Sequence, residues 1–267
     1  MEQHRKENGD IRMSSELLNV KGFEIGNGKP MICVPVMAET KDEIVKLIRK
    51  YVADGVNMIE WRIDAFEDLE DVNKLRDVLE AVRALLDKTI FVYTYRSKEQ
   101  GGNGNVSEEQ LKRIHLAGAM SGVVDFVDVE YFALSKPEVE IKQIQECGAY
   151  VISSHHDFDE TPDANVIRML LEQMDASGAD IVKLAVMPQS KKDVFTLLIQ
   201  TMLFRQQHPN KPIISMSMGA EGIISRVAGE FYGSCVTFGA GDKSSAPGQI
   251  PYSKLEIILD ILHENYI

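Results

Sequence analysis

Residues 149–186, AYVISSHHDFDETPDANVIRMLLEQMDASGADIVKLAV, decide the fold class of this chain. The run begins and ends with short apolar segments rich in β-branched residues, AYVISS and DIVKLAV. Between them, Ile167, Leu170, Leu171 and Met174 recur at helical spacing. Thr161 before Pro162 is typical of a helix start. A strand, a helix and a second strand, each strand almost wholly apolar, predict a parallel sheet covered by helices.

The same unit recurs along the chain. Helix starts at 40–43 (TKDE) and 253–256 (SKLE) fit the capping box, in which side chains bind the first free N–H groups. Eight apolar runs begin near Met31, Asn57, Thr89, Val124, Ala149, Asp180, Pro212 and Ser234. Eight strand–helix units favour an α/β protein of the (β/α)₈ TIM-barrel type, with an open doubly wound sheet as the alternative.

The ends of the chain and its length complete the predicted organisation. Residues 1–16 are polar and of mixed charge, and we expect a flexible N-terminal extension there. Residues 18–29 (LNVKGFEIGNGK) predict a small hairpin that closes the bottom of the barrel. No linker interrupts the pattern, so residues 17–267 are predicted to form one catalytic domain.

Composition narrows the possible partners and the compartment. The 267 residues include 29 Lys and Arg against 41 Asp and Glu, a net charge of −12. Nucleic acid and anionic membrane surfaces are therefore unexpected partners, and an anionic substrate would need a few local cations. Three scattered cysteines, Cys33, Cys147 and Cys235, make no disulfide framework. With no long apolar run and no signal peptide, we expect a cytoplasmic protein.

Ionisable residues interrupt the predicted strands near their carboxyl ends, where barrel enzymes place their chemistry. Because side chains alternate along a strand, pairs two residues apart share a face. Four such pairs are Glu60 and Arg62, Thr94 and Arg96, Asp128 and Glu130, and Ser154 and His156. An interior with this many ionisable groups is not a plain barrel core.

Lys183 and His156 are the candidate catalytic residues. Lys183 lies among Ile181, Val182, Leu184 and Ala185, and desolvation there would favour the neutral amine, a nucleophile toward carbonyls. The alternative is a snorkelling or ion-paired structural lysine.

A histidine ending a strand can take and return a proton near neutral pH, or it can cap the next helix instead. Adjacent His155 and His156 point to opposite faces, and no motif with zinc spacing is present, so we expect no metal site.

Three arginines at or beyond strand ends, Arg62, Arg96 and Arg226, could hold an anionic substrate. A guanidinium pairs with a carboxylate through two parallel hydrogen bonds. Each could equally form a structural ion pair with Asp or Glu. The segment 238–249 (FGAGDKSSAPGQ) predicts a long loop that serves as a lid or a phosphate-binding turn.

Five separate segments together resemble type I 3-dehydroquinate dehydratase, a Schiff-base-forming hydro-lyase of the shikimate pathway. They are 60–64 (EWRID), 95–102 (YRSKEQGG), 154–158 (SHHDF), 179–188 (ADIVKLAVMP), and the run from 216 to 249 that contains MSM, ISR and SSAPGQ. The resemblance covers residues 20–267. It implies a (β/α)₈ barrel, a homodimer without metal or organic cofactor, and conversion of 3-dehydroquinate to 3-dehydroshikimate for aromatic amino acid biosynthesis.

The same resemblance assigns roles to individual residues. Lys183 corresponds to the Schiff-base lysine and His156 to the general acid–base. Met218 and Phe238 correspond to apolar walls, and Arg226 to the group that takes the substrate carboxylate. The implied substrate-binding set is Glu60, Arg62, Arg96, Arg226, Ser245 and Gln249.

One position departs from the family. Some members carry a glutamate directly before the Gly-Gly pair, poised to assist the histidine. Here that position is Gln100, with Glu99 one residue earlier. Either Glu99 or Gln100 could therefore be the side chain that assists His156.

Two other functions compete with this interpretation. Another Schiff-base lyase on the same barrel, such as an aldolase, would use the lysine but bind phosphate at the glycines near 239–241. The arginines and the Met/Phe wall favour a carboxylated ring instead. A catalytically inactive barrel that serves as a scaffold is the second alternative, and Lys183 with His156 argues against it.

Overall fold

The structure, a computed structural model, describes residues 18–266, so the expected extension over residues 1–16 lies outside the described part. Its strands are β1 (Leu18–Val20), β2 (Phe23–Ile25), β3 (Met31–Val36), β4 (Met58–Arg62), β5 (Ile90–Thr94), β6 (Phe126–Glu130), β7 (Tyr150–Asp157), β8 (Ile181–Val186), β9 (Ile213–Ser217) and β10 (Val236–Phe238). Its α-helices are α1 (Lys41–Ala53), α2 (Val72–Val82), α3 (Glu108–Ala119), α4 (Pro137–Glu146), α5 (Ala164–Ala176), α6 (Lys191–Gln207), α7 (Ile224–Val227), α8 (Gly229–Tyr232) and α9 (Tyr252–Glu264).

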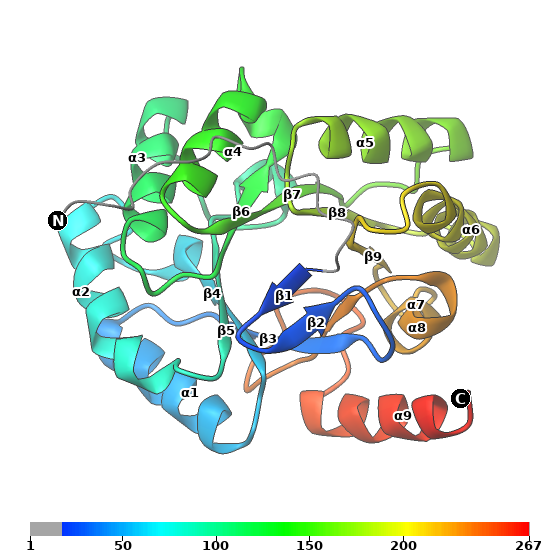
Figure 1. The fold of residues 1–267 in the computed structure, drawn as a ribbon, viewed down its shortest axis with the longest axis horizontal. Helices are drawn as coiled ribbons and strands as arrows, with labels where there is room; N and C mark the ends of the chain where they lie inside the picture. The colour runs from blue at the N-terminus through cyan, green and yellow to red at the C-terminus, as the bar shows by residue number, and fades with distance from the viewer. Residues whose placement is uncertain (1–17, 267) are drawn as a thin grey trace, which may run out of the picture.

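Strands β3 to β10 form a ring of parallel strands with the helices outside it (Figure 1). Each strand from β3 to β8 pairs with the next, and β10 returns to pair with β3, Val236 beside Met31. Between β9 and β10, the Cys235 N–H donates to the Ile213 carbonyl at 2.8 Å and Ile213 forms a parallel bridge with Ser234. The sheet therefore closes into a barrel, and the open doubly wound alternative is excluded.

The helices cover the ring with the apolar faces that their spacing predicts. In α1, Ile44, Ile48 and Tyr51 are buried, and the Thr40 hydroxyl accepts the Glu43 N–H at its start. In α5, Ile167, Leu170, Leu171 and Met174 are all buried. Burial of these faces against the strands is what holds the helices on the barrel.

Two predicted helix starts are wrong by two residues each. Helix α5 begins at Ala164, because the Asp163 carboxylate accepts the Asn165 and Val166 N–H groups. The Thr161 hydroxyl instead donates to the Met187 carbonyl, which ties the β7–α5 loop to the end of β8. Helix α9 begins at Tyr252, directly after Pro251, so Ser253 lies inside its first turn.

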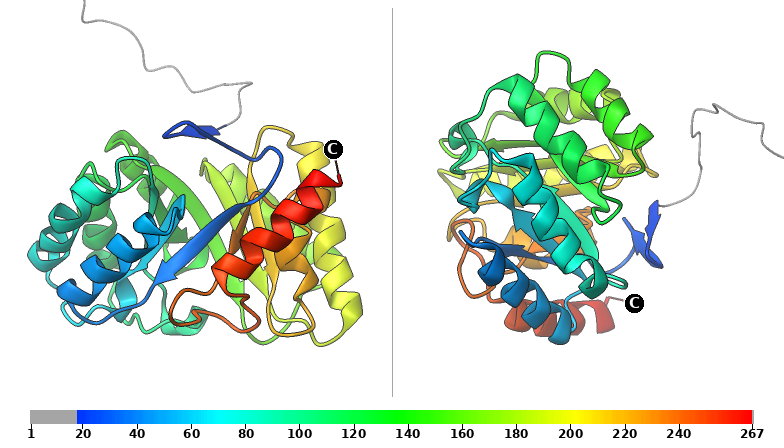
Figure 2. Two further views of the ribbon diagram at one scale, coloured as in Figure 1. Left: turned by 90° about the horizontal axis from the view of Figure 1, so that it is seen from below. Right: turned by 90° about the vertical axis from the view of Figure 1, so that its left-hand side faces the viewer.

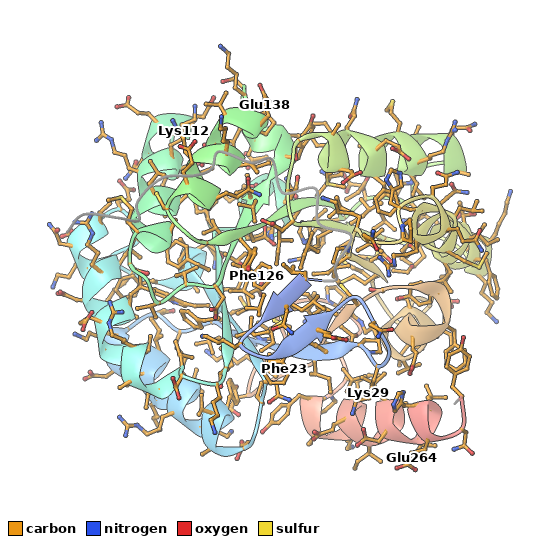
Figure 3. The ribbon with its side chains drawn as sticks, viewed as in Figure 1. Phe23, Lys29, Lys112, Phe126, Glu138 and Glu264 are labelled. Atoms are coloured by element: carbon orange, nitrogen blue, oxygen red, sulfur yellow. The ribbon has the colours of Figure 1, made fainter. Side chains whose placement is uncertain are left out.

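The N-terminal hairpin closes the bottom of the barrel, as the sequence predicts. Strands β1 and β2 pair antiparallel, and Val20 and Ile25 pack on interior residues such as Phe126. Phe23 of the hairpin packs against the apolar cluster that contains Phe126, and both lie near the middle of the view in Figure 3, whereas Lys112 and Glu138 lie at the periphery on α3 and α4. At the opposite end of the barrel lies the β10–α9 loop, residues 239–251, drawn in orange-red in Figure 2.

The barrel interior is divided along its axis. Near the hairpin the strands point apolar side chains inward, namely Met58, Ile90, Phe126, Ile152 and Ile181. Towards the carboxyl ends of the strands the buried side chains become polar and charged. The fold thus places an ionisable layer above an apolar floor.

Candidate active site

The ionisable layer follows from the register of neighbouring strands. Glu130 on β6 pairs with Ser154 on β7, and Ser154 pairs with Lys183 on β8. All three side chains are buried. His156 lies two residues beyond Ser154 on the same strand face, one step nearer the open end of the barrel.

Lys183 lies between two carboxylates. Its Nζ donates to Asp128 Oδ2 at 2.8 Å and lies 3.6 Å from Glu60 Oε1 and 4.6 Å from the centre of the Phe238 ring. The apolar surroundings expected from its strand neighbours are therefore only half of its environment. Burial alone would raise the pKa of Asp128, but Arg96 and Lys183 outweigh it and hold that pKa well below its ordinary value.

Arg96 and Arg62 are both bound to carboxylates. Arg96 donates to Asp128 at 2.8 Å, to Glu130 at 2.9 Å and to the Ser154 hydroxyl at 3.1 Å. Arg62 donates two hydrogen bonds to the Asp64 carboxylate, from Nε at 2.7 Å and from Nη2 at 2.8 Å. Each guanidinium is thus already neutralised by this chain, and each fixes the walls of the site.

His156 is held by Gln100, the last residue of the short 3₁₀-helix η3 (Lys98–Gln100). The Gln100 Oε1 accepts the His156 backbone N–H at 2.8 Å and lies 3.0 Å from Nδ1. Since the backbone contact identifies this atom as the oxygen, Nδ1 must carry a proton, which leaves Nε2 as the free base. Glu99 is exposed.

The charge state of His156 follows from its surroundings. Burial, with Arg96, Lys183 and Arg62 nearby, holds the pKa of His156 well below its ordinary value of 6.5. The imidazole is therefore neutral at pH 7. His155 points elsewhere and packs against Phe132, with ring centres 5.0 Å apart, as the strand alternation predicts.

The β10–α9 loop covers the mouth of the site. Gln249 accepts the Ser245 N–H at 2.8 Å and returns a hydrogen bond to the Ser245 hydroxyl at 2.9 Å. At Gly248, φ is +77°, and a Cβ would lie 2.3 Å from the Gly219 carbonyl oxygen. Only glycine permits this backbone-to-backbone contact, which sets the position of the loop.

A single pocket brings together all of the predicted site residues except Arg226. It is lined by Glu60, Arg62, Arg96, Gln100, Gly101, His156, Phe158, Lys183, Ala185, Met216, Met218, Phe238, Ser245, Ala246 and Gln249. Met218 and Phe238 supply the apolar wall that the resemblance implies. The pocket combines charged groups with thioether and aromatic groups.

Arg226 lies in α7, behind the loop rather than in the pocket lining. It is 1% exposed, and its Nη2 donates to the Pro247 carbonyl at 2.9 Å. Its Nε and Nη1 have no partner, and burial lowers the pKa of this guanidinium to about 10. Among the described residues, Arg226 is the arginine with buried, unsatisfied donors.

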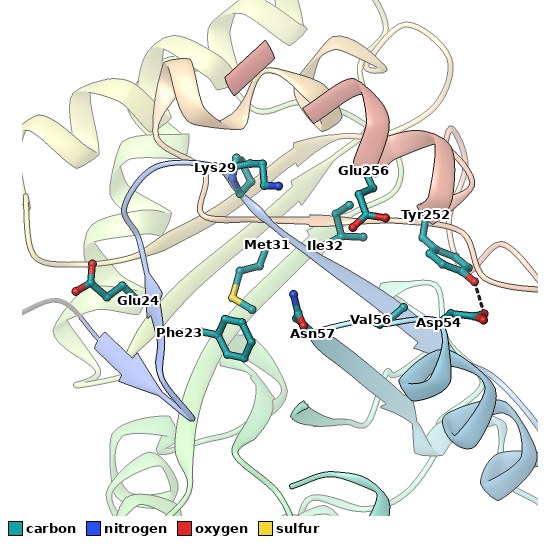
Figure 4. A pocket seen from close by; sticks show the side chains of 12 residues that line it. Phe23, Glu24, Lys29, Met31, Ile32, Asp54, Val56, Asn57, Tyr252 and Glu256 are labelled. Carbon is teal, nitrogen blue, oxygen red and sulfur yellow. Dashed lines mark hydrogen bonds between the residues drawn. The ribbon is translucent and has the colours of Figure 1, made fainter. Parts of the chain in front are cut away.

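A second hollow lies at the other end of the barrel, between the hairpin, the start of β3 and α9 (Figure 4). Met31, Ile32 and Val56 line it, and its rim carries Tyr252, whose hydroxyl donates to Asp54 at 2.6 Å. No residue of the predicted site lines this hollow. The chemistry of the chain is therefore expected at the loop-covered end.

No helix among residues 18–266 combines the length and apolar character needed to cross a bilayer. Within the same residues, no group of three or more His, Cys, Asp and Glu is arranged to hold a metal ion.

Comparison with known proteins shows the family to which this barrel belongs. The model of the type I 3-dehydroquinase family matches residues 32–266. The chain belongs to this family. A 3-dehydroquinate dehydratase of Clostridium botulinum is 40% identical over 253 residues, which cover 93% of this chain and 98% of that protein. One from Listeria innocua is 40% identical over 251 residues, 92% of this chain and 98% of that one.

Solved structures of type I 3-dehydroquinases have the same fold. The Clostridium difficile enzyme, solved with covalently modified comenic acid, superposes with a TM-score of 0.90 at 36% identity and covers 94% of this chain and 100% of its own. The 3-dehydroquinate dehydratase of Geobacillus kaustophilus also gives 0.90, at 33% identity, over 96% and 99%.

Several residues in or beside this type I 3-dehydroquinase pocket were missing from the predicted site. Asp128, the partner of Lys183, shares an interior strand face with Glu130, and that spacing was the available signal. Gly101 lies directly against the Phe158 ring, and a Cβ at Gly101 would lie only 2.3 Å from the nearest atom of that ring. No local sequence pattern predicts such a contact between residues 57 positions apart.

Proposed function

We propose that the chain dehydrates 3-dehydroquinate to 3-dehydroshikimate, with Lys183 as the Schiff-base nucleophile and His156 as the general acid–base. The observation that carries this proposal is the joint position of the two side chains in one pocket on neighbouring strands, β8 and β7. The family membership supports 3-dehydroquinate as the substrate. The joint presence of an amine nucleophile and an imidazole base supports the Schiff-base mechanism. The phosphate-binding aldolase alternative has no comparable support.

The first stage is the attack of Lys183 on the ring ketone. Asp128 and Glu60 flank the ammonium, and Glu60 is proposed to accept the proton that it must lose, because the pKa of Asp128 is held well below its ordinary value. The amine then adds to the carbonyl carbon, and the carbinolamine loses water to give an iminium ion. The iminium withdraws electrons from the neighbouring carbon and so acidifies its protons.

The second stage is proton transfer by His156. Neutral Nε2 removes the proton next to the iminium, and the electron pair moves to the nitrogen to give an enamine. The imidazolium then protonates the β-hydroxyl group, which leaves as water while the enamine returns to an iminium. Hydrolysis releases 3-dehydroshikimate and restores the amine of Lys183.

Arg226 is proposed to bind the substrate carboxylate. Arg62 is held by Asp64, and Arg96 by Asp128 and Glu130, whereas Arg226 has two buried N–H groups without an acceptor. A carboxylate that replaced the Pro247 carbonyl on Nη2 could pair with Nη2 and with either Nε or Nη1, through two parallel hydrogen bonds. Ser245 and Gln249 on the loop are proposed to hold ring hydroxyls, and Glu60, Arg62 and Arg96 to shape the floor.

We further propose a homodimer, the assembly that the family resemblance implies, and a cytoplasmic location. The three cysteines support the latter, because Cys33, Cys147 and Cys235 are all free thiols. In that setting the reaction serves the shikimate pathway, whose product supplies aromatic amino acids.

Borohydride trapping tests the proposed route. Reduction during turnover of 3-dehydroquinate should inactivate the protein and leave one ligand mass on Lys183, located by peptide mass spectrometry. Growth of the absorbance of the conjugated product tests the reaction itself. Label on another lysine would refute the assignment of Lys183 as the Schiff-base residue. Absence of the conjugated product would refute 3-dehydroquinate as the substrate.

A further inference from the structure

Arg226 lies on a helical turn that cannot hold its own position. Helix α7 has only four residues, Ile224–Val227, and Arg226 is buried within it. A single turn makes too few internal hydrogen bonds to be stable by itself, because fixing its backbone costs more entropy than those bonds return. The place of the Arg226 guanidinium therefore depends on the contacts that neighbouring elements make with this turn.

At the start of α7, the Ser225 hydroxyl connects the turn to the end of β9. This hydroxyl accepts the Ser217 N–H at 2.9 Å and donates to the Gly222 carbonyl at 2.7 Å. Ser217 is the last residue of β9, and Met216 and Met218 on either side of it line the pocket. The turn that carries Arg226 is thus anchored to a strand of the pocket wall.

At the end of α7, two side-chain hydroxyls from other elements bind the backbone. Tyr232 Oη, in α8, donates to the Ser225 carbonyl at 2.5 Å, and Thr237 Oγ1, in β10, donates to the Arg226 carbonyl at 2.9 Å. Carbonyls in the last turn of a helix have no partner within the helix. All four residues are buried, so each hydroxyl satisfies a carbonyl that water does not reach freely.

We infer that Thr237 and Tyr232 are positioning residues for Arg226 and thereby set the affinity of this chain for the carboxylate of its substrate. Side chains alternate along β10, so Phe238 faces the pocket while Thr237 faces α7. One strand thus supplies both an apolar wall of the pocket and the support of the arginine. This inference deepens the carboxylate-binding role proposed above for Arg226 and rests on it.

The unsatisfied donors of Arg226 explain why its position matters. A guanidinium and a carboxylate form two parallel hydrogen bonds only when the two planar groups are aligned. Nε and Nη1 of Arg226 are buried without a partner. If α7 shifted, these N–H groups would gain less from the substrate carboxylate and would find no water in its place. Affinity for the carboxylate therefore depends on the hydroxyls that fix the turn.

Substitutions that remove one hydroxyl and keep the side-chain shape test this inference. Thr237→Val and Tyr232→Phe should each raise KM for 3-dehydroquinate by about 3- to 10-fold, the factor that one neutral hydrogen bond is typically worth. The value of kcat should stay within about twofold, because binding of a group remote from the reacting atoms is lost equally in the ground and transition states. Thr237→Ser keeps the hydroxyl and should restore the wild-type KM.

Thr201→Val in α6 is the matched control. Thr201 is also buried, and its hydroxyl donates to the Leu197 carbonyl at 2.9 Å, the same distance as the bond from Thr237 to Arg226. This variant loses a buried hydroxyl on a different helix and should leave KM unchanged. A rise in KM as large as that of Thr237→Val would mean that general destabilisation is the cause, and it would overturn the inference.

The double variant of Arg226→Ala with Thr237→Val separates this inference from the proposal on which it rests. If Thr237 acts through Arg226, the double variant should have the same KM as Arg226→Ala alone. Losses that add in the double variant, or equal losses of Thr237→Val on the substrate and its carboxamide analogue, would overturn the positioning role while the carboxylate role of Arg226 stands. Equal losses of Arg226→Ala on both substrates would overturn both roles.

Discussion

The contact between Gln100 and His156 makes a quantitative prediction. Gln100→Glu replaces a neutral oxygen, 3.0 Å from Nδ1, with a carboxylate in a buried place. Unit charges 4 Å apart interact by about 4 kcal/mol at an effective dielectric constant of 20. At 1.36 kcal/mol per pKa unit this corresponds to about 3 units. A carboxylate at this range usually shifts a partner's pKa by about 1–3 units.

The sign of the effect is fixed by the role of the imidazole. Only neutral His156 can remove the substrate proton, so kcat/KM falls as pH drops through the pKa of His156 in the free enzyme. In the wild type this acidic limb should lie below pH 6.5, because burial and the nearby cations lower that pKa. In Gln100→Glu the limb should move upward by about 1–3 units.

The assay measures kcat/KM from the growth of product absorbance at a series of pH values between about 4 and about 9. Glu99→Gln is the control, because Glu99 is exposed and its loss should leave the limb in place. A wild-type limb above pH 6.5, or an unmoved limb in Gln100→Glu, would refute the assignment of His156 as a neutral base held by Gln100.

Three further predictions address individual groups. His156→Ala should still be trapped by borohydride, with kcat reduced by about 10²–10⁴-fold, whereas His155→Ala should retain near-normal kcat; the reverse pattern would contradict the strand-face assignment. EDTA should leave the rate unchanged, and an activity restored by a divalent ion would point to a metal-dependent route. Arg226→Ala should lower kcat/KM by about 30- to several-thousand-fold for the natural substrate and much less for its carboxamide analogue. Equal losses on both substrates would make Arg226 structural.

The sequence predicted the barrel and most of the pocket, because both depend on alternation along strands. Glu60, Arg96, His156 and Lys183 interrupt apolar runs, and strand alternation places their side chains on the inward face of the closed sheet. The hairpin was likewise predictable from its apolar and turn residues. Local pattern was enough wherever one strand face determined the environment.

Predictions that depended on loops were less complete. Glu99 and Gln100 are adjacent, and only the turn of η3 determines that Gln100 faces His156. Arg226 was expected at the barrel mouth, but α7 places it behind the loop against Pro247, 21 residues away. The start of α5 moved because the Asp163 carboxylate caps two N–H groups, two residues after Thr161.

The ion pair between Lys183 and Asp128 also bears on which covalent species would accumulate. An ammonium and an iminium each carry one positive charge, so Asp128 and Glu60 keep a counterion when the Schiff base forms. The enamine is neutral, so Glu60 loses the cation 3.6 Å away and Asp128 keeps only Arg96, which is costly in a protein interior. The pocket should therefore hold the iminium as its long-lived covalent form and keep the enamine brief. Rapid quenching should recover adducts at the iminium level on both sides of the elimination.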